Sequence, residues 1–196
     1  SDNTDCCAEL KNGIKYGFLD SSILALEEYK PRLLINDFDR GEKILTSLVV
    51  ELTKCDEFMI SVAFITSSGV TVLLNTLSDL EQRGVKGRII ASQYQNFTDP
   101  TALKRLLRFK NIELRIVTED AANMHTKGYI FRKDEEYSII VGSSNLTQNA
   151  LCENKEWNLK VSSSFKGGIV YNVVSEFEIM FELAIPVDYN WLAAYM

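Results

Sequence analysis

Up to about residue 117, short apolar runs alternate with segments whose apolar side chains recur at helical spacing. Residues 58–64 (FMISVAF) are rich in strand-forming types and predict a strand buried on both faces. A helix is predicted before it, over residues 41–54, and another after it, from an N-cap within residues 66–68 to about Arg83, with Gly84 as the stop. Strands joined through helices pair in parallel by right-handed crossovers, so this rhythm narrows the choice of fold more than any other feature.

The alternation continues with strands predicted over residues 85–91 and 112–117. Between them, Asp99 caps a helix that carries Pro100 in its first turn and runs to about Lys110. We therefore expect an α/β protein with a mixed, mainly parallel central sheet and helices on both faces.

The rhythm then changes. Two strands, 127–132 and 137–141, are predicted to flank a charged turn, and a further strand covers 157–161. A long helix follows over residues 169–183, which carry an apolar stripe at helical spacing. The sequence shows no internal repeat, so whatever site the chain carries occurs in it once.

This pattern divides the chain into three parts. Residues 1–40 form a partly ordered lead-in or arm, with a short helix at 22–29 and an arm or edge strand at 31–37. Residues 41–185 form the main domain, and residues 186–196 form a tail that could lead into a further domain.

Composition and charge exclude some classes of protein. With 46% hydrophobic and 24% charged residues, the chain can bury a core. A net charge of −6 argues against a protein that grips nucleic acid with its whole surface, although a local basic groove is compatible with it. Neither an apolar run of about 18 residues nor a signal-peptide pattern is present, so we expect no membrane association.

The cysteines predict neither a metal site nor disulfides. Cys6, Cys7, Cys55 and Cys152 show no zinc-ligand spacing, and the chain has a single histidine. We therefore expect no metal, no cofactor, and reduced thiols in a cytoplasmic protein.

The residues that carry chemistry begin with the single histidine. His125 is followed two positions later by Lys127, and residues two apart on an extended strand point to the same face. A phosphodiester reaction needs such a pair, because a neutral imidazole attacks phosphorus while a cation holds the non-bridging oxygens.

A second cluster follows a predicted strand end. In Gly142-Ser143-Ser144-Asn145, glycine allows close approach of the backbone, and Ser143 and Asn145 can both donate hydrogen bonds to phosphate oxygens. Glu156 stands eleven residues after Asn145, and a carboxylate beside an imidazole fixes its tautomer and raises its basicity.

This order of His-x-Lys, Gly-Ser-x-Asn and Glu resembles the phospholipase D superfamily, specifically its nuclease-like branch. The resemblance implies a phospholipase D-like fold for the domain at 41–185. It also implies roles for individual residues: His125 as nucleophile or acid, Lys127, Ser143 and Asn145 as phosphate binders, and Glu156 as the carboxylate partner of the histidine.

One position departs from the family's fuller motif, which has an Asp where this chain has Arg132. The departure counts more against lipid chemistry than against nuclease chemistry. Residues 28–36, 61–66 and 191–195 also look like the phospholipase D-like domain at the N-terminus of bacterial helicase-like proteins, which, like a related group of restriction endonucleases, use one such domain per chain.

Some residues carry competing interpretations. Glu153 is a rival for the role of Glu156. Tyr94 and Phe97 suit the core or its rim, with stacking on a base as the alternative. One helix is predicted to have a basic face, either solvated or in contact with a phosphate backbone, formed by Lys104, Arg105, Arg108 and Lys110.

The combined prediction is a metal-independent nuclease domain that cleaves DNA through a phosphohistidine, within a helicase-like or restriction protein. One alternative is a phosphodiesterase or phosphatidyltransferase acting on lipid headgroups, which an apolar lip or an amphipathic surface helix would favour, and neither is evident in the sequence. Another is a catalytically weak nucleic-acid-binding or dimerisation module. Because the chain holds one histidine and one copy of the motif, we predict a homodimer with a shared active site.

Overall fold

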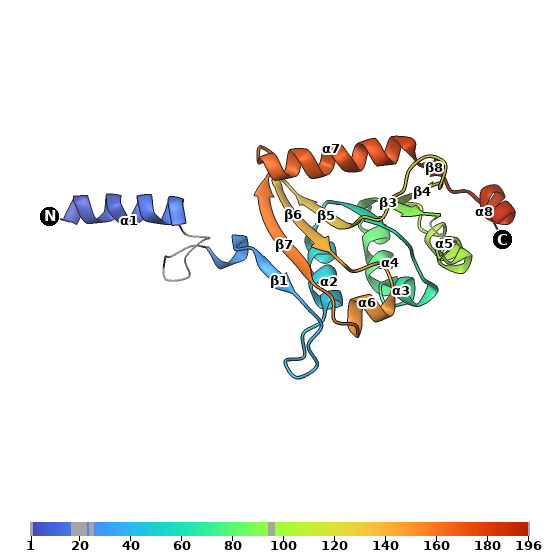
Figure 1. The fold of residues 1–196 in the computed structure, drawn as a ribbon, viewed down its shortest axis with the longest axis horizontal. Helices are drawn as coiled ribbons and strands as arrows, with labels where there is room; N and C mark the ends of the chain where they lie inside the picture. Colours follow the sequence, from blue (N-terminus) through green and yellow to red (C-terminus); the bar gives the residue numbers. More distant parts are fainter. Residues whose placement is uncertain (1, 17–22, 24–25, 94–96, 196) are drawn as a thin grey trace.

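The protein folds around one eight-stranded sheet, which Figure 1 shows flanked by helices. The structure is a computed structural model that describes residues 2–16, 23, 26–93 and 97–195. The strand order is β1-β7-β6-β5-β2-β3-β4-β8. The strands are β1 (Arg32–Leu34), β2 (Glu57–Val62), β3 (Lys86–Ser92), β4 (Ile112–Val117), β5 (Lys127–Lys133), β6 (Glu136–Gly142), β7 (Asn158–Ser164) and β8 (Ile185–Pro186).

The sheet is mixed and mostly antiparallel, so the expectation of a mainly parallel sheet was wrong. Among the strands of the described residues, β2–β3 and β3–β4 are the two parallel pairs, and these are the strands joined by the predicted helical crossovers. The sequential strands β5, β6 and β7 pair antiparallel, and β5 also pairs antiparallel with β2. The alternation of helices and strands correctly predicted parallel pairing for β2, β3 and β4. It did not apply to the strands that follow β4, which pair antiparallel.

Helices cover both faces of the sheet, as expected. On one face, α7 is the described helix that packs against a core that includes Met59, Ile130 and Phe177. The other face carries the larger core, to which α2 to α6 and α8 contribute side chains. The helices are α1 (Asp2–Tyr16), α2 (Ile44–Lys54), α3 (Ser67–Thr71), α4 (Leu74–Gln82), α5 (Pro100–Leu106), α6 (Gln148–Cys152), α7 (Gly168–Leu183) and α8 (Tyr189–Tyr195), with a 3₁₀ turn at Glu27–Tyr29.

Local signals set several helix ends. Thr66 caps α3 by accepting a hydrogen bond from the Gly69 amide at 3.2 Å. Asp99 caps α5 through the Thr101 amide at 2.8 Å, which confirms the predicted cap. Gly84 has a φ of +71°, a conformation that glycine adopts without strain, and it follows α4. The single helix predicted here is in fact two, α3 and α4.

The ends of the chain differ from the expectations. Residues 2–16 form α1, which Figure 1 shows apart from the sheet. The predicted helix over 22–29 lies partly outside the described residues, and only the 3₁₀ turn appears in its described part. The arm or edge strand at 31–37 is found as β1 at the sheet edge. Leu192 of α8 packs into the larger core, while the limits of the three parts of the chain remain predictions.

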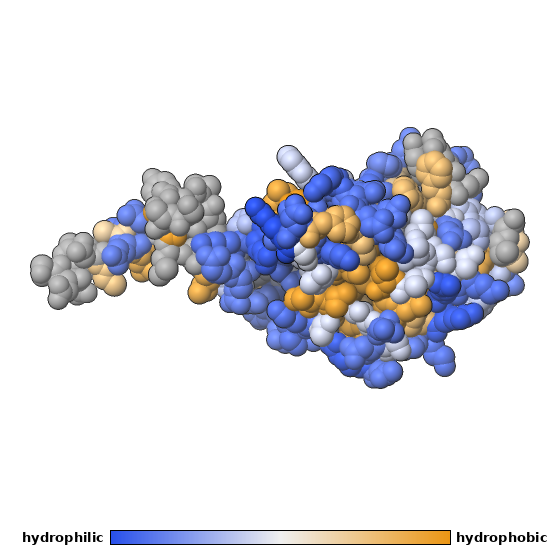
Figure 2. All heavy atoms as spheres, turned by 90° about the horizontal axis from the view of Figure 1, so that it is seen from below, coloured by the Kyte–Doolittle hydropathy of each residue, from blue (hydrophilic) through white to orange (hydrophobic). Residues whose placement is uncertain are grey.

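The face drawn in Figure 2 is mainly hydrophilic. Figure 2 shows a hydrophobic area in the middle of the face seen from below, bordered by hydrophilic residues.

Candidate active site

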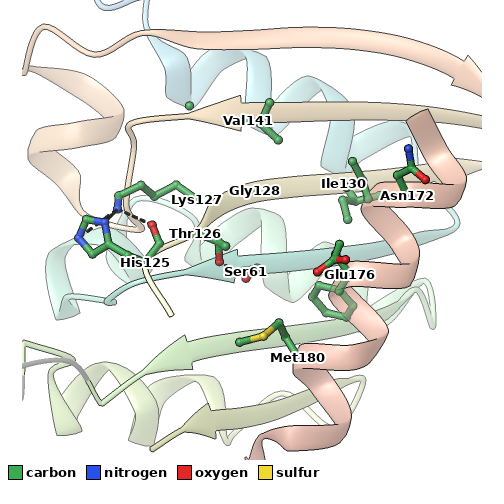
Figure 3. Close-up of a pocket in the computed structure, with 13 residues that line it drawn as sticks. Ser61, His125, Thr126, Lys127, Gly128, Ile130, Val141, Asn172, Glu176 and Met180 are labelled. Carbon is green, nitrogen blue, oxygen red and sulfur yellow. Dashed lines mark hydrogen bonds between the residues drawn. The ribbon is translucent and has the colours of Figure 1, made fainter. Parts of the chain in front are cut away.

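His125 and Lys127 come together at the beginning of β5 (Figure 3). Lys127 is the first residue of that strand and pairs with Val62 at the end of β2. His125 lies in the irregular segment just before the strand. The prediction that His125 and Lys127 share one face of a strand was therefore wrong. The lysine instead turns back, and its Nζ lies 2.9 Å from His125 Nδ1 and donates to the His125 carbonyl at 3.0 Å.

The environment of Lys127 is partly desolvated. Burial lowers the pKa of the Lys127 ammonium, and the nearby charge of Glu156 opposes that shift. An ammonium group has only donors, so its 2.9 Å contact uses the lone pair of His125 Nδ1. The pair therefore presents an imidazole and a cation at one point, and a phosphodiester reaction needs both, the first to attack phosphorus and the second to hold the oxygens.

The turn at residues 142–145, which we call the motif turn, lies against the beginning of β7. The Ser143 amide donates to the Trp157 carbonyl at 3.1 Å, and the Trp157 amide donates to Ser143 Oγ, also at 3.1 Å. A side chain at Gly142 would place its Cβ 2.2 Å from the Trp157 carbonyl oxygen. Glycine is thus required here for close approach of two backbones, as the sequence suggested.

Glu156 joins this turn. Ser143 Oγ donates to the Glu156 carboxylate in a short hydrogen bond, and Glu156 is half-buried. The rival Glu153 is exposed and accepts a hydrogen bond from Gln148 at 3.4 Å. The structure therefore places Glu156 beside Ser143, and its charge acts on Lys127.

Asn145, a predicted phosphate binder, is buried. Its side chain is 8% exposed, and Oδ1 accepts a hydrogen bond from the Phe64 amide at 3.3 Å. This contact ties the motif turn to the chain that leaves β2. The acceptor of the amide is used inside the protein, so only its Nδ2 donor suits a phosphate.

Ser61 is a site residue that the sequence reasoning missed. It lies on β2 opposite Gly128, and its hydroxyl is 2.6 Å from that of Thr126, the residue between His125 and Lys127. Ser61 begins the segment 61–66, but nothing in the sequence places it at the site, because the antiparallel pairing of β2 with β5 brings it to the motif.

A hollow of about 520 Å³ opens beside His125 and Lys127, between the sheet and α7 (Figure 3). Its walls are largely apolar, with Ile130 and Met180 among them. Glu176 from α7 supplies a carboxylate. Nothing in the sequence indicated this apolar hollow, which forms only where the sheet and α7 meet.

Other candidate residues lie elsewhere in the fold. Arg105 of the basic helix α5 donates to Thr71 Oγ1 at 2.5 Å, so it takes part in packing α5 on α3. Phe97 is 51% exposed and meets Phe64 edge-on at 5.7 Å, while Tyr94 lies outside the described residues. Arg132, at the position of the motif Asp, donates to Glu57 at 3.1 Å.

Two properties of the described residues bear on function. None of their helices is long and apolar enough to cross a membrane. Across the same residues, His, Cys, Asp and Glu side chains form no group of three that could hold a metal ion.

Together, the mixed sheet with helices on both faces and the His-Lys pair beside a Gly-Ser-x-Asn turn define a phospholipase D-like domain. Comparison with protein families agrees, because residues 49–182 match the model described as cardiolipin synthase, PLD-like domain. The match covers more than half of the chain, so the chain belongs to this family. No match is found among curated proteins.

Solved structures share the fold. NucT from Helicobacter pylori superposes with a TM-score of 0.63 at 20% identity, over 81% of this chain and 99% of that one. Nuc from Salmonella typhimurium, a phospholipase D family member, gives 0.61 at 16% identity with the same coverage. Phosphatidylserine synthase from Haemophilus influenzae gives 0.62 at 14% identity, over 80% of this chain and 40% of that protein.

Proposed function

We propose that the chain is a metal-independent phosphodiesterase and that it acts as a nuclease on DNA. The observation that carries the proposal is the contact between Lys127 and His125 at 2.9 Å, beside Ser143 and Glu156. The similarity of the whole domain to Nuc and NucT supports a nuclease over other phosphodiesterases, since each is covered over 99% of its length.

In the proposed reaction, a nitrogen of His125 attacks phosphorus and a bond from phosphorus to nitrogen forms while the bond to the leaving alkoxide breaks. Lys127 and the Nδ2 donor of Asn145 hold the non-bridging oxygens, on which negative charge increases. Ser143 joins them by exchanging its hydrogen bond to Glu156 for one to a phosphate oxygen. Glu156 accepts the Ser143 hydroxyl proton in a hydrogen bond and so orients that side chain. Water then opens the phosphohistidine and regenerates the imidazole.

The leaving alkoxide must gain a proton, and this chain has a single histidine to serve as nucleophile. We infer that a second copy of the chain supplies the acid, so that two copies of His125 face one phosphate across a two-fold axis. Digestion of DNA by a strictly monomeric species would contradict the shared site.

An exposed row of apolar side chains supports this pairing. Leu33, Leu159 and Val141 are cross-strand neighbours on β1, β7 and β6, and they are 56%, 45% and 39% exposed. The next positions in the same row are Gly128 and Ser61, which line the hollow at the active site. We call these first three residues the apolar row and propose that the second copy covers it, because the row is continuous with the site that the second copy must complete.

A lipid-headgroup phosphodiesterase or phosphatidyltransferase is the second candidate, favoured by the apolar hollow beside His125. The loss of the motif Asp, replaced by Arg132, counts against lipid chemistry, and the carboxylate of Glu176 in the hollow would repel an anionic headgroup. We further propose, from the resemblance of residues 28–36, 61–66 and 191–195 to helicase-associated domains, that the chain serves a cytoplasmic helicase-like or restriction protein.

Incubation with single-stranded DNA, double-stranded DNA and phosphatidylglycerol vesicles, each with and without EDTA, tests the proposal. We expect DNA fragments in the presence of chelator, and none from a His125→Ala variant whose circular dichroism is unchanged. Headgroup release without DNA cleavage would contradict the nuclease and support the lipid-headgroup phosphodiesterase. Cleavage that requires magnesium would contradict the metal-independent mechanism.

A further inference from the structure

The motif turn depends on two buried residues that no motif assigns, Tyr129 and Asn158. Ser144, the residue between Ser143 and Asn145, is 0% exposed. Its side chain therefore points into the protein while its two neighbours serve the site. Ser144 is the point at which the turn is anchored.

Both side chains bind Ser144. Asn158 on β7 donates from Nδ2 to Ser144 Oγ at 2.9 Å and accepts from the Ser144 amide through Oδ1 at 3.4 Å. Tyr129 on β5 donates its hydroxyl proton to the Ser144 carbonyl at 3.0 Å. The amide, the hydroxyl and the carbonyl of Ser144 are therefore each engaged by one of two side chains from different strands.

The network is closed to water. Tyr129 and Asn158 are each 1% exposed, and burial, followed by the charge of Glu156, raises the pKa of the tyrosine hydroxyl. A buried polar group left without its partner costs about 1–3 kcal/mol, so these groups keep one arrangement. Gly142 permits it, since a Cβ at that position would lie 2.6 Å from the Asn158 Cα.

The strands that hold Tyr129 and Asn158, which we call the two anchors, also hold or adjoin residues of the candidate active site. Tyr129 stands two residues after Lys127 on β5, and Asn158 stands two residues after Glu156 at the start of β7. By fixing Ser144, the two anchors fix Ser143 relative to Lys127 and Glu156. The side chains of the proposed site thus come from β5, the motif turn and the start of β7, and Ser144 is the buried residue that is hydrogen-bonded to both strands.

We propose that Asn158 and Tyr129 are positioning residues for phosphate binding and turnover, acting through Ser144. The inference rests on the proposed phosphodiesterase function. Misplacing a catalytic group by about 1 Å can cost about 100-fold in rate. We therefore expect Asn158→Leu to lower kcat by about 10- to 100-fold, with a smaller change in KM, in protein that remains folded.

The test uses the full chain, bis(p-nitrophenyl) phosphate as the diester, and inorganic phosphate as a binding probe. Asn111→Leu is the matched control, because the Asn111 amide donates to the Val85 carbonyl at the opposite end of the sheet and should affect stability alone. Tyr129→Phe removes only a hydroxyl, so it keeps the core volume and serves if Asn158→Leu does not fold.

We expect Asn158→Leu and Tyr129→Phe to lower both kcat and the affinity for phosphate, while Asn111→Leu preserves both. Adding Ser144→Ala to Asn158→Leu should cost little further activity, since the two residues act as one unit. Folded anchor variants with wild-type kcat and wild-type phosphate affinity would overturn the inference. If the wild-type chain bound phosphate but left the diester intact, the proposed function would fail, and the phosphate affinities of the variants would decide the inference separately.

Discussion

Replacing Leu159 by aspartate should separate the proposed dimer into inactive monomers. Leu159 is the central member of the apolar row and is 45% exposed, between Leu33 and Val141 on the neighbouring strands. Its side chain is accessible for nearly half of its area in the single chain, so a partner can still bury that part. The substitution changes no residue of the candidate active site.

The expected magnitude follows from that exposure. Burying a whole leucine side chain contributes about 1.5–3 kcal/mol, so the exposed part of Leu159 contributes about 1 kcal/mol. A two-fold interface contains the residue twice, which gives about 2 kcal/mol, or about 30-fold in the dimer dissociation constant. The cost of placing two carboxylates in the interface adds to this loss.

Sedimentation equilibrium over a concentration series, combined with DNA digestion on the same samples, measures both consequences. Leu183→Asp is the matched control, because Leu183 at the end of α7 is 50% exposed and lies outside the apolar row. We expect that control to remain dimeric and active. The reasoning is refuted if Leu159→Asp dimerises as tightly as wild type, or if it is monomeric and still cleaves DNA.

Three further changes have defined outcomes. Lys127→Ala should lower kcat by about 100- to 1,000-fold in single-turnover assays, as expected for one lost oxyanion partner, and a wild-type rate would remove Lys127 from the site. Because burial lowers the pKa of Lys127, the ammonium loses its proton at lower pH than an exposed lysine, so kcat should decline on the alkaline side below the usual lysine range, and Lys127→Arg should lack that decline. Asp99 accepts hydrogen bonds from the Thr101 and Ser67 amides, so Asp99→Ala should lower the free energy of unfolding by about 1–2 kcal/mol in urea titrations without changing kcat per folded molecule.

Much of the local structure could be predicted from residues close together in the sequence. Thr66 and Asp99 cap helices because their side chains reach amides two or three positions away, which requires no knowledge of the rest of the fold. The strand at 112–117 was predicted with its observed limits. Short elements such as α6 and β8 were missed, since five and two residues carry too little periodicity to detect.

The candidate site was predicted in part. The order of His125, Lys127, the motif turn and Glu156 is visible in the sequence, and the structure brings Ser143 to Glu156 and Lys127 to His125. The burial of Asn145 could not be foreseen, because its partner, the Phe64 amide, is 81 positions away. The roles of these residues remain predictions until variants are assayed.

What the sequence by itself determined is most of the longer helices and strands, the caps at Thr66 and Asp99, and the types of side chain available for phosphodiester chemistry. Only the tertiary structure decided that the sheet is mostly antiparallel, that Tyr129 and Asn158 meet at Ser144, and that the apolar row is left uncovered. The physical reason is the distance along the sequence over which each interaction acts. Capping and periodicity depend on neighbours within a few residues, whereas strand order and burial depend on which distant segments exclude water from each other.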